Sequence, residues 1–498
     1  MYTVDAEGWR LGRCALAVAA LFATVPASAL TVPASNFTVG TGASSTVVSG
    51  NPDGNTVLIT SNQTADLPVQ TYYSVGPIQN HGTFNNGNGT AFPWLRIMGP
   101  AATFDNYGTA NNLSDLYVQD ISVLGTNATP GSGSIYNHSG GTFNNGSGIF
   151  DPKQGAYGYG SISSYDLSTI TNDGTFNNYS YLYTFKNNID NSGIVNNGQF
   201  NNYAPKDSFG PTMDLEGSLT NTGTLHNAAG AAMTMGGTFT NAATGVFINE
   251  GSYESSVFGP TNPGTLINQG RVEFRASATG QSPNFYAPGH FIQQPGGTLI
   301  VDGRFVESRF EIQGGTVSGS GTLDTTHSDA GSGAQNVLIG PGSTLNPGSG
   351  IFGNSANNRM TIVGNLSLTG TFEIGLGGGG SSGAGQGTQY SFLHVLGDGG
   401  ASSGLVNLGG VLTVDLAPGF TSQVGNYYDI LQADGGLNGV FASPATFTDG
   451  GYTFEEAIVG NTLRLDVIAA VPELPSGVLL GCGALLTLIA ARRRRFVS

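Results

Sequence analysis

The sequence contains almost no cysteine and little charge. Its 498 residues include two cysteines, Cys14 and Cys482, and only 10% of the residues are Asp, Glu, Lys or Arg. Each cysteine lies in an apolar segment near one end, so the long stretch between them contains none. A disulfide framework and a thiolate metal site are therefore excluded there, and stability must come from burial and backbone pairing.

Basic residues are scarce as well. The chain holds 16 Lys and Arg against 32 Asp and Glu, a formal net charge of −16. Without the two terminal segments described below, 10 basic and 29 acidic residues remain, a net charge of −19. Such a surface attracts neither nucleic acid nor anionic lipid, so we expect no nucleic-acid partner. With 10% aromatic residues, the composition is nonetheless unlike that of a disordered chain.

Residues 1–29 have the pattern of a secretory signal peptide. Two arginines precede the apolar run CALAVAALFATV, and Ala27 and Ala29 are the small residues that a signal peptidase requires. We predict cleavage after Ala29. Cys14 directly follows an arginine, without the small apolar residues that precede a lipid-bearing cysteine, which argues against a lipoprotein. The remainder of the chain is predicted to be exported.

One short phrase recurs between residues 30 and 335. It has the form Asn-x-Gly-x-apolar-x-Asn, as in TNDGTFNNYS, QNHGTFNNGN and TNTGTLHN. Alternate residues of a strand point to the same side, so the Asn, Gly and apolar side chains are expected to share one face. The apolar residues recur roughly every 20 to 25 positions, which is typical of a solenoid in which each coil pairs only with its neighbours.

The repeats predict an all-β fold, a β-solenoid. About 300 residues give on the order of 12 to 15 coils, and at about 4.8 Å per rung these form a rod of roughly 60 to 70 Å. Gly174 is expected to permit a tight bend or a close approach of two backbones. The apolar residues of the phrases are predicted to be buried: Phe84, Phe143, Phe176, Phe200, Leu225 and Phe239.

The repeated asparagines have two interpretations. They can stack from coil to coil inside the solenoid as hydrogen-bonded amide ladders. They can equally form turns on its outside, where asparagine is common. Both interpretations predict the same fold, and the sequence leaves the choice between them open.

Residues 336–470 have a different composition. They contain alternating strand candidates such as MTIVGNLSLTGTFEIGL and VLTVDLAPGF, separated by glycine and proline turns. With LNPGSG, YYDIL and a following GVF, this segment resembles the C-terminal passenger region of autotransporter-like proteins. The resemblance implies a right-handed parallel β-helix whose end is closed by a β-rich capping region. The alternating strands of an outer-membrane barrel, which follow in true autotransporters, are not seen in this sequence.

Residues 471–498 combine three signals. A turn-prone segment contains Pro472, Glu473 and Pro475; an apolar stretch follows from residue 477 to residue 491; and the arginines Arg492, Arg493, Arg494 and Arg495 come next. The apolar stretch of 15 residues would form a helix about 22 Å long, which is shorter than the hydrocarbon core of a membrane, about 30 Å. We therefore predict one short C-terminal membrane helix.

This tripartite tail resembles the PEP-CTERM sorting signal of Gram-negative bacteria, although Leu474 is inserted before the second proline. The resemblance implies a membrane precursor in the inner membrane, cleavage by an exosortase-type membrane protease, and release to the cell surface or the extracellular matrix. The alternative is a permanent tail anchor, with the arginines held in the cytoplasm by the positive-inside rule.

Two charged strand candidates suit a catalytic groove. They are VESRFEI, with Glu307, Arg309 and Glu311, and GRVEFRA, with Arg271, Glu273 and Arg275. Strand alternation would place each trio on one face, as a polysaccharide lyase or hydrolase requires. A solvated, ion-paired strand face has the same pattern and is far more common.

No cofactor or metal motif is present in the sequence. The histidines are scattered, and no His-Glu-x-x-His spacing occurs. We therefore assign no catalytic residue, no metal and no cofactor. The sequence favours a non-catalytic structural or adhesive protein of the cell surface or exopolysaccharide matrix, with exopolysaccharide or cell-surface glycans as partners. The alternative is a polysaccharide lyase or hydrolase on the same scaffold.

Overall fold

The computed structural model describes the chain from residue 57 to residue 470, with gaps, and the backbone of residues 37–38. The gaps between these limits are 39–56, 62–63, 68–71, 75, 88–93, 100, 120–132, 147–149, 152–155, 158–159, 166–167, 185, 188–189, 192, 204–212, 256–263, 278–288, 326–335, 349–356, 378–384 and 400–401. All regular elements among the described residues are β-strands. The prediction of an all-β fold is confirmed for this part of the chain.

Two long sheets run through the molecule, each with 15 strands in parallel. Sheet A contains β1 (Phe37–Thr38), β3 (Thr64–Leu67), β6 (Thr83–Asn86), β9 (Thr109–Asn112), β12 (Thr142–Asn145), β17 (Thr175–Asn178), β22 (Gln199–Asn202), β25 (Thr224–Asn227), β28 (Val246–Asn249), β31 (Arg271–Phe274), β33 (Thr298–Val301), β36 (Gly315–Gly319), β39 (Ser343–Pro347), β42 (Thr371–Leu376) and β45 (Val411–Leu416). Sheet B contains β2 (Val57–Ile59), β5 (Ile78–Asn80), β8 (Thr103–Asn106), β11 (Ser134–Asn137), β16 (Thr169–Asn172), β21 (Gly193–Asn196), β24 (Ser218–Asn221), β27 (Thr238–Asn241), β30 (Thr265–Asn268), β32 (His290–Gln293), β35 (Arg309–Ile312), β38 (Asn336–Ile339), β41 (Asn365–Leu368), β44 (Val406–Leu408) and β47 (Leu437–Gly439).

The third face, sheet C, is described in two parts of eight strands each. The first contains β4 (Tyr72–Ser74), β7 (Trp94–Met98), β10 (Asp115–Gln119), β15 (Ser161–Ser164), β18 (Tyr181–Thr184), β23 (Met213–Leu215), β26 (Ala232–Met235) and β29 (Ser252–Glu254). The second contains β34 (Arg304–Val306), β37 (Thr322–Asp324), β40 (Arg359–Val363), β43 (Phe392–Leu396), β46 (Tyr427–Ala433), β50 (Thr462–Ala470), β49 (Tyr452–Val459) and β48 (Thr446–Asp449). Two short antiparallel pairs stand apart from these faces: β13 (Phe150–Asp151) with β14 (Ala156–Tyr157), and β19 (Lys186–Asn187) with β20 (Asp190–Asn191).

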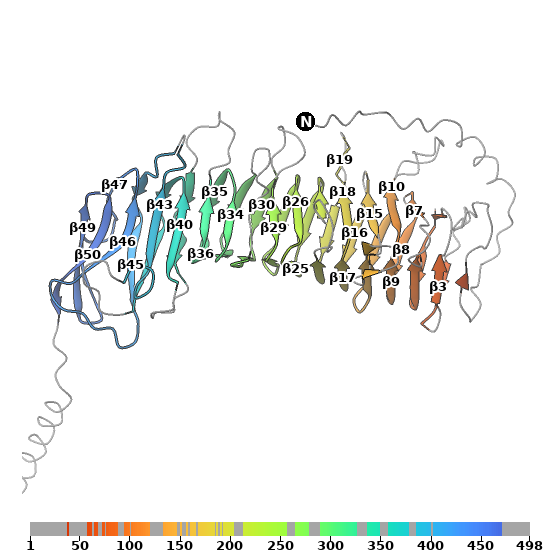
Figure 1. The fold of residues 1–498 in the computed structure, drawn as a ribbon, viewed down its shortest axis with the longest axis horizontal. Helices are drawn as coiled ribbons and strands as arrows, with labels where there is room; N and C mark the ends of the chain where they lie inside the picture. Colours follow the sequence, from red (N-terminus) through yellow and green to blue (C-terminus); the bar gives the residue numbers. More distant parts are fainter. Residues whose placement is uncertain are drawn as a thin grey trace, which may run out of the picture.

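The chain visits the three faces in the order B, A, C and then begins the next coil, as in β16, β17 and β18. Each strand pairs in parallel with the strand one coil away, so that Phe143, Phe176 and Phe200 lie in register. Figure 1 shows the coils stacked along the long axis, with β3 near one end and β49 and β50 at the other. Fifteen rungs about 4.8 Å apart extend over roughly 65 to 70 Å. Twelve of the fifteen strands of sheet A lie before residue 336, which agrees with the predicted number of coils. These twelve rungs extend over roughly 53 Å, less than the length predicted for this segment, and the coils beyond residue 335 supply the rest of the rod.

The repeated sequence phrase spans the corner between sheet B and sheet A. Asn80 ends β5 in sheet B, and Phe84 and Asn86 lie on β6 in sheet A, with Gly82 between the two strands. All four of these side-chain positions are buried, while His81 between them is exposed. The prediction that Asn, Gly and apolar residues share one side is confirmed, but that side bends around a corner of the coil instead of following one strand.

Apolar residues of the three faces form one continuous core. All the residues predicted to be buried are at most 5% exposed: Phe84, Phe143, Phe176, Phe200, Leu225 and Phe239. Phe176 stacks on Phe143 at a ring-centroid distance of 4.9 Å and on Phe200 at 4.6 Å. The core therefore gains ring stacking from coil to coil in addition to burial.

Two buried amide ladders line the corners of the coils. The first has nine members, each donating from its amide nitrogen to the amide oxygen of the next: Asn80, Asn106, Asn137, Asn172, Asn196, Asn221, Asn241, Asn268 and Gln293. The second has seven: Asn86, Asn112, Asn145, Asn178, Asn202, Asn227 and Asn249. These asparagines are inside, so the ladder interpretation is confirmed for them. Successive members of the first ladder are between 20 and 35 residues apart, a wider range than the sequence suggested.

Gly174 follows Asn172 at such a corner. A Cβ atom on Gly174 would lie 2.3 Å from the carbonyl oxygen of Gly141 and 2.5 Å from that of His138. Both distances are far below van der Waals contact, so close backbone approach is what requires glycine here. Of the two roles expected for this glycine, the structure supports close approach.

Replacing Asn172 with leucine is expected to lower the free energy of unfolding by about 3 kcal/mol, because several buried polar groups lose a partner. Asn172 accepts from Asn137 at 2.7 Å and donates to Asn196 at 2.8 Å and to the Gln199 carbonyl at 3.0 Å. Urea unfolding measures the loss. Asn197→Ala, a change at an exposed position one coil on, is the control and should cost less than about 1 kcal/mol; equal losses would contradict a structural role for the ladder.

The parallel ladder continues past residue 335, where the composition changes. β35 pairs with β38, β38 with β41 and β41 with β44, all in parallel. Within sheet C, antiparallel pairing of strands begins with β50, which joins β46, and continues through β49 and β48. The segment 336–470 therefore carries further coils, followed by an antiparallel end.

The described residues contain no helix with the length and hydropathy needed to cross a membrane. The short C-terminal helix predicted from the sequence falls in residues 471–498, outside the part of the chain that the structure describes.

Candidate functional site

The residues of the two predicted targeting signals lie outside the described part of the chain. They are Ala27 and Ala29 at the expected cleavage point, and Pro472, Glu473, Pro475, Arg492, Arg493, Arg494 and Arg495 in the sorting tail. The sites that the structure can test are the two charged trios.

The structure separates the first trio, Glu307, Arg309 and Glu311. Strand β34 ends at Val306 and β35 begins at Arg309, so Glu307 lies at a corner between sheets C and B. The Glu307 side chain is fully buried. Arg309 is exposed, and Glu311 lies beside it on the outer face of β35, with Nη2 of Arg309 3.3 Å from Oε2 of Glu311. The expectation that the three residues share one strand face was wrong, because a corner interrupts the alternation.

Glu307 belongs to a buried polar cluster with Ser255, Gly289 and Tyr253. The Ser255 hydroxyl donates to Oε2 of Glu307 at 2.5 Å and accepts from the Gly289 amide at 2.9 Å. Oε1 of Glu307 and the Tyr253 hydroxyl are buried without a hydrogen-bond partner. Burial raises the pKa of Glu307 to about 8, and the hydrogen bond from Ser255 opposes this rise. Glu307 is therefore a protonated acid at neutral pH.

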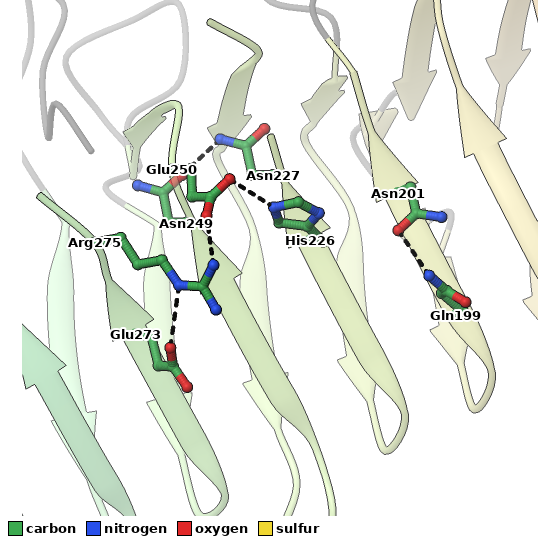
Figure 2. A network of polar contacts seen from close by, with 8 residues as sticks. All are labelled: Gln199, Asn201, His226, Asn227, Asn249, Glu250, Glu273 and Arg275. Atoms are coloured by element: carbon green, nitrogen blue, oxygen red, sulfur yellow. Dashed lines mark hydrogen bonds and ion pairs between the residues drawn. The ribbon is translucent and has the colours of Figure 1, made fainter. Parts of the chain in front are cut away.

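The second trio remains together on the outer face of β31. Nε of Arg271 donates to Glu273 at 2.5 Å, and Nε of Arg275 lies 3.4 Å from the other oxygen of Glu273. Arg275 also donates to Glu250 at 2.5 Å, and Glu250 lies 3.1 Å from Nε2 of His226 (Figure 2). The interpretation of this trio as an ion-paired strand face is supported.

Hydrogen bonds within this network favour the ionised form of Glu250. Hydrogen bonds from Arg275 and then from His226 hold the pKa of Glu250 below its usual value. Glu273 is shared between two guanidinium groups. The Glu250 carboxylate therefore stays ionised and is poorly placed to deliver a proton to a glycosidic oxygen, and both oxygens of Glu273 are engaged by guanidinium groups.

Arg275→Ala is expected to change the free energy of unfolding by less than about 1 kcal/mol, because the ion pairs of Arg275 lie on a solvent-exposed face. Urea unfolding at low and high salt measures the effect. A loss above about 3 kcal/mol would show that the network is structural, as expected only of buried pairs.

Four of the described histidines lie near an acidic side chain: His138, His226, His290 and His394. His138 lies 3.2 Å from Asp105, and His394 lies 3.3 Å from Asp434. His327 is outside the described residues. Among the residues that the structure describes, no three His, Cys, Asp or Glu side chains converge as a metal site would require.

A cluster that sequence reasoning missed lies on the outer face of sheet C. We call it the aromatic strip; its members, on or just after β7, β10, β15 and β18, are Trp94, Arg96, Tyr117, Tyr165, Tyr181 and Tyr183. The signal was present in WLRIM, DLYVQ, SISSY and YLYT, where large rings or arginine alternate with core residues. The intervals between these strands vary, which hid the recurrence.

Strand pairing defines the class of this protein: an all-β chain of stacked parallel coils. No family model matches the sequence, and no curated protein matches it. Among solved structures, the chain is similar to a TibC-catalyzed hyper-glycosylated TibA fragment, with 12% identity over 81% of this chain and 100% of that chain. The TM-score is 0.21, so this likeness carries no inference about function.

Proposed function

We propose that the chain is a secreted, non-catalytic structural or adhesive protein of the bacterial cell surface or exopolysaccharide matrix. The observation that carries the proposal is the scaffold itself, a rod with one continuous core and two amide ladders that stabilise its coils over residues 80–293 and 86–249. Of the two charged trios, one is dispersed by a corner and the other is ion-paired. A rigid rod with long outer faces suits spacing and multivalent contact better than turnover.

The coils are proposed to be right-handed, since connections between parallel strands nearly always are. The antiparallel end formed by β48, β49 and β50 is proposed to act as the cap of the stack. The N-terminal signal would export the chain, and an exosortase-type protease would recognise the tail of a transient inner-membrane precursor in a Gram-negative bacterium. The partners are then that protease, the membrane, and exopolysaccharide or cell-surface glycans.

Incubation of the purified chain with the producer's own exopolysaccharide tests the non-catalytic role. We expect the length distribution of the polymer to stay unchanged in size-exclusion chromatography. Reproducible shortening or new unsaturated chain ends would support the alternative, a polysaccharide lyase or hydrolase, and would defeat the structural role.

Mass spectrometry of surface material tests the sorting step. Prolines 472 and 475 disfavour helix around Glu473 and would leave that stretch accessible to a membrane protease. We expect the mature protein to lack the arginine-rich end. Recovery of mature peptides that run through residues 477–491 would favour the permanent anchor instead.

A further inference from the structure

The aromatic strip distinguishes the outer face of sheet C from that of sheet A. Four adjacent rungs of sheet C place Trp94, Asp115, Ser161 and Tyr181 in one row. A second row, in the same register, contains Arg96, Tyr117, Ser163 and Tyr183. On the corresponding rungs of sheet A the outward positions hold mainly threonine and asparagine, as in Thr142, Asn144, Thr175 and Asn177. Large rings are therefore concentrated on one of these two faces.

Contacts within the strip hold its rings in place. The Arg96 guanidinium lies 5.5 Å from the centre of the Trp94 ring and 5.2 Å from that of Tyr117. Tyr117 stacks with Tyr165 at 6.4 Å, and Tyr181 stacks with Tyr183 at 5.8 Å. Trp94 remains 41% exposed. Rings that are fixed before a ligand arrives lose little entropy on binding, so such a face is preorganised.

Polar side chains lie between the rings of the strip. The Ser161 hydroxyl donates to Asp115 at 2.5 Å. Burial raises the pKa of the Tyr117 and Tyr165 phenols, and that of Tyr183 to about 12, so these groups keep a proton to donate. Tyr117 and Tyr183 are two rungs apart, roughly 9.6 Å along the rod. The strip thus places hydroxyl and carboxylate groups on the rungs between its rings.

We propose that the aromatic strip binds an uncharged polysaccharide chain that runs along the rod. Pyranose rings present C–H groups on a flat face and hydroxyls around the rim. The C–H groups pack on aromatic rings, and the sugar hydroxyls exchange hydrogen bonds with Asp115, Ser161 and the phenols. This inference rests on the proposed function, because it assigns a site to the glycan contact of a surface or matrix protein.

Charge selects an uncharged polymer over an acidic one. Arg96 is the one basic residue among the outward positions of these four rungs, and its guanidinium lies against two rings. Asp115 and Asp214 provide carboxylates on the same face, in a protein of net charge −16. Like charges would repel a polyanion along the whole length of the rod.

Affinity electrophoresis of the full chain in nonionic detergent tests the site. Native gels would contain hydroxyethylcellulose, dextran, galactomannan or alginate. We expect retardation by at least one of the three uncharged polymers and none by alginate. Trp94→Ala and Tyr117→Ala should each weaken binding roughly tenfold, the loss of about one ring contact.

Two further variants separate binding from folding. Tyr117→Phe keeps the ring and should retain most of the binding. Tyr107→Ala removes a ring that is also 41% exposed but lies at a corner between sheets B and A, and it should bind as wild type. The proposal fails if only alginate retards the chain, if no uncharged polymer does, or if the two alanine variants of the strip bind normally. None of these outcomes bears on the non-catalytic role, which the chain-shortening assay decides.

Discussion

Replacing Phe176 with aspartate is expected to lower the free energy of unfolding by about 5 kcal/mol or more. The ring is 0% exposed and is stacked between Phe143 and Phe200. Its loss removes core contacts, and the new carboxylate would be buried without a cationic partner. Urea unfolding followed by far-ultraviolet circular dichroism measures the change.

Asn177→Asp is the matched control for this experiment. It adds the same charge one residue along β17, on the outer face, where Asn177 donates to Asn144 and accepts from Asn201. The cost there should stay within about 1 kcal/mol. Similar losses at both positions would show that residue 176 does not face a core.

The pH dependence of stability is expected to reveal Glu307. Its pKa is about 8 in the folded chain against a usual value of 4.5. Between these values the folded state holds a proton that the unfolded state has released. The contribution of Glu307 to the free energy of unfolding is therefore complete below pH 4.5, falls as the pH rises from 4.5 towards 8, and is lost above pH 8. The expected loss is on the order of 4 kcal/mol.

Glu307→Gln should remove this part of the pH profile, because the amide stays neutral and can still accept from Ser255. Urea midpoints at pH 5, 7 and 9 measure the difference between the variant and the wild type. Glu311→Gln, a change on the outer face, should follow the wild-type profile. Parallel profiles for Glu307→Gln and the wild type would overturn the assignment of a buried, protonated acid.

The repeated phrase allowed the core to be predicted because burial follows strand alternation. Phe176 and Phe200 are where the pattern places them, and alternation even survives the corner between β16 and β17. The period was less predictable, since coils differ in length at the corners while their strands stay in register. Residues 137 and 172, for instance, are neighbours in one ladder although 35 residues separate them.

Asparagine was the residue that sequence reasoning could not place. Asn172 and Asn177 belong to the same phrase, yet the first is buried in a ladder and the second lies on the outer face. Both make side-chain hydrogen bonds to the neighbouring coils. Residue type therefore does not distinguish inside from outside; only the parity of the position relative to the aromatic residue does.

Corners explain the errors at the candidate site. Glu307 and Arg309 are two residues apart, which in one strand would place them side by side, but the chain changes face between them. Neither glycine nor proline marks that corner in VESRFEI. The aromatic strip escaped notice for a related reason, since its members are adjacent only through parallel pairing of strands far apart in the sequence.

The constant pairing between successive coils also has an evolutionary consequence. Each ladder asparagine donates the same amide hydrogen bond to the next, whether 20 or 35 residues separate the two. An in-frame duplication of a single coil would therefore create two interfaces of a kind already present and disturb few others, since each coil contacts only its neighbours. A lineage can then lengthen or shorten the reach of this rod in steps of about 4.8 Å without redesigning its core.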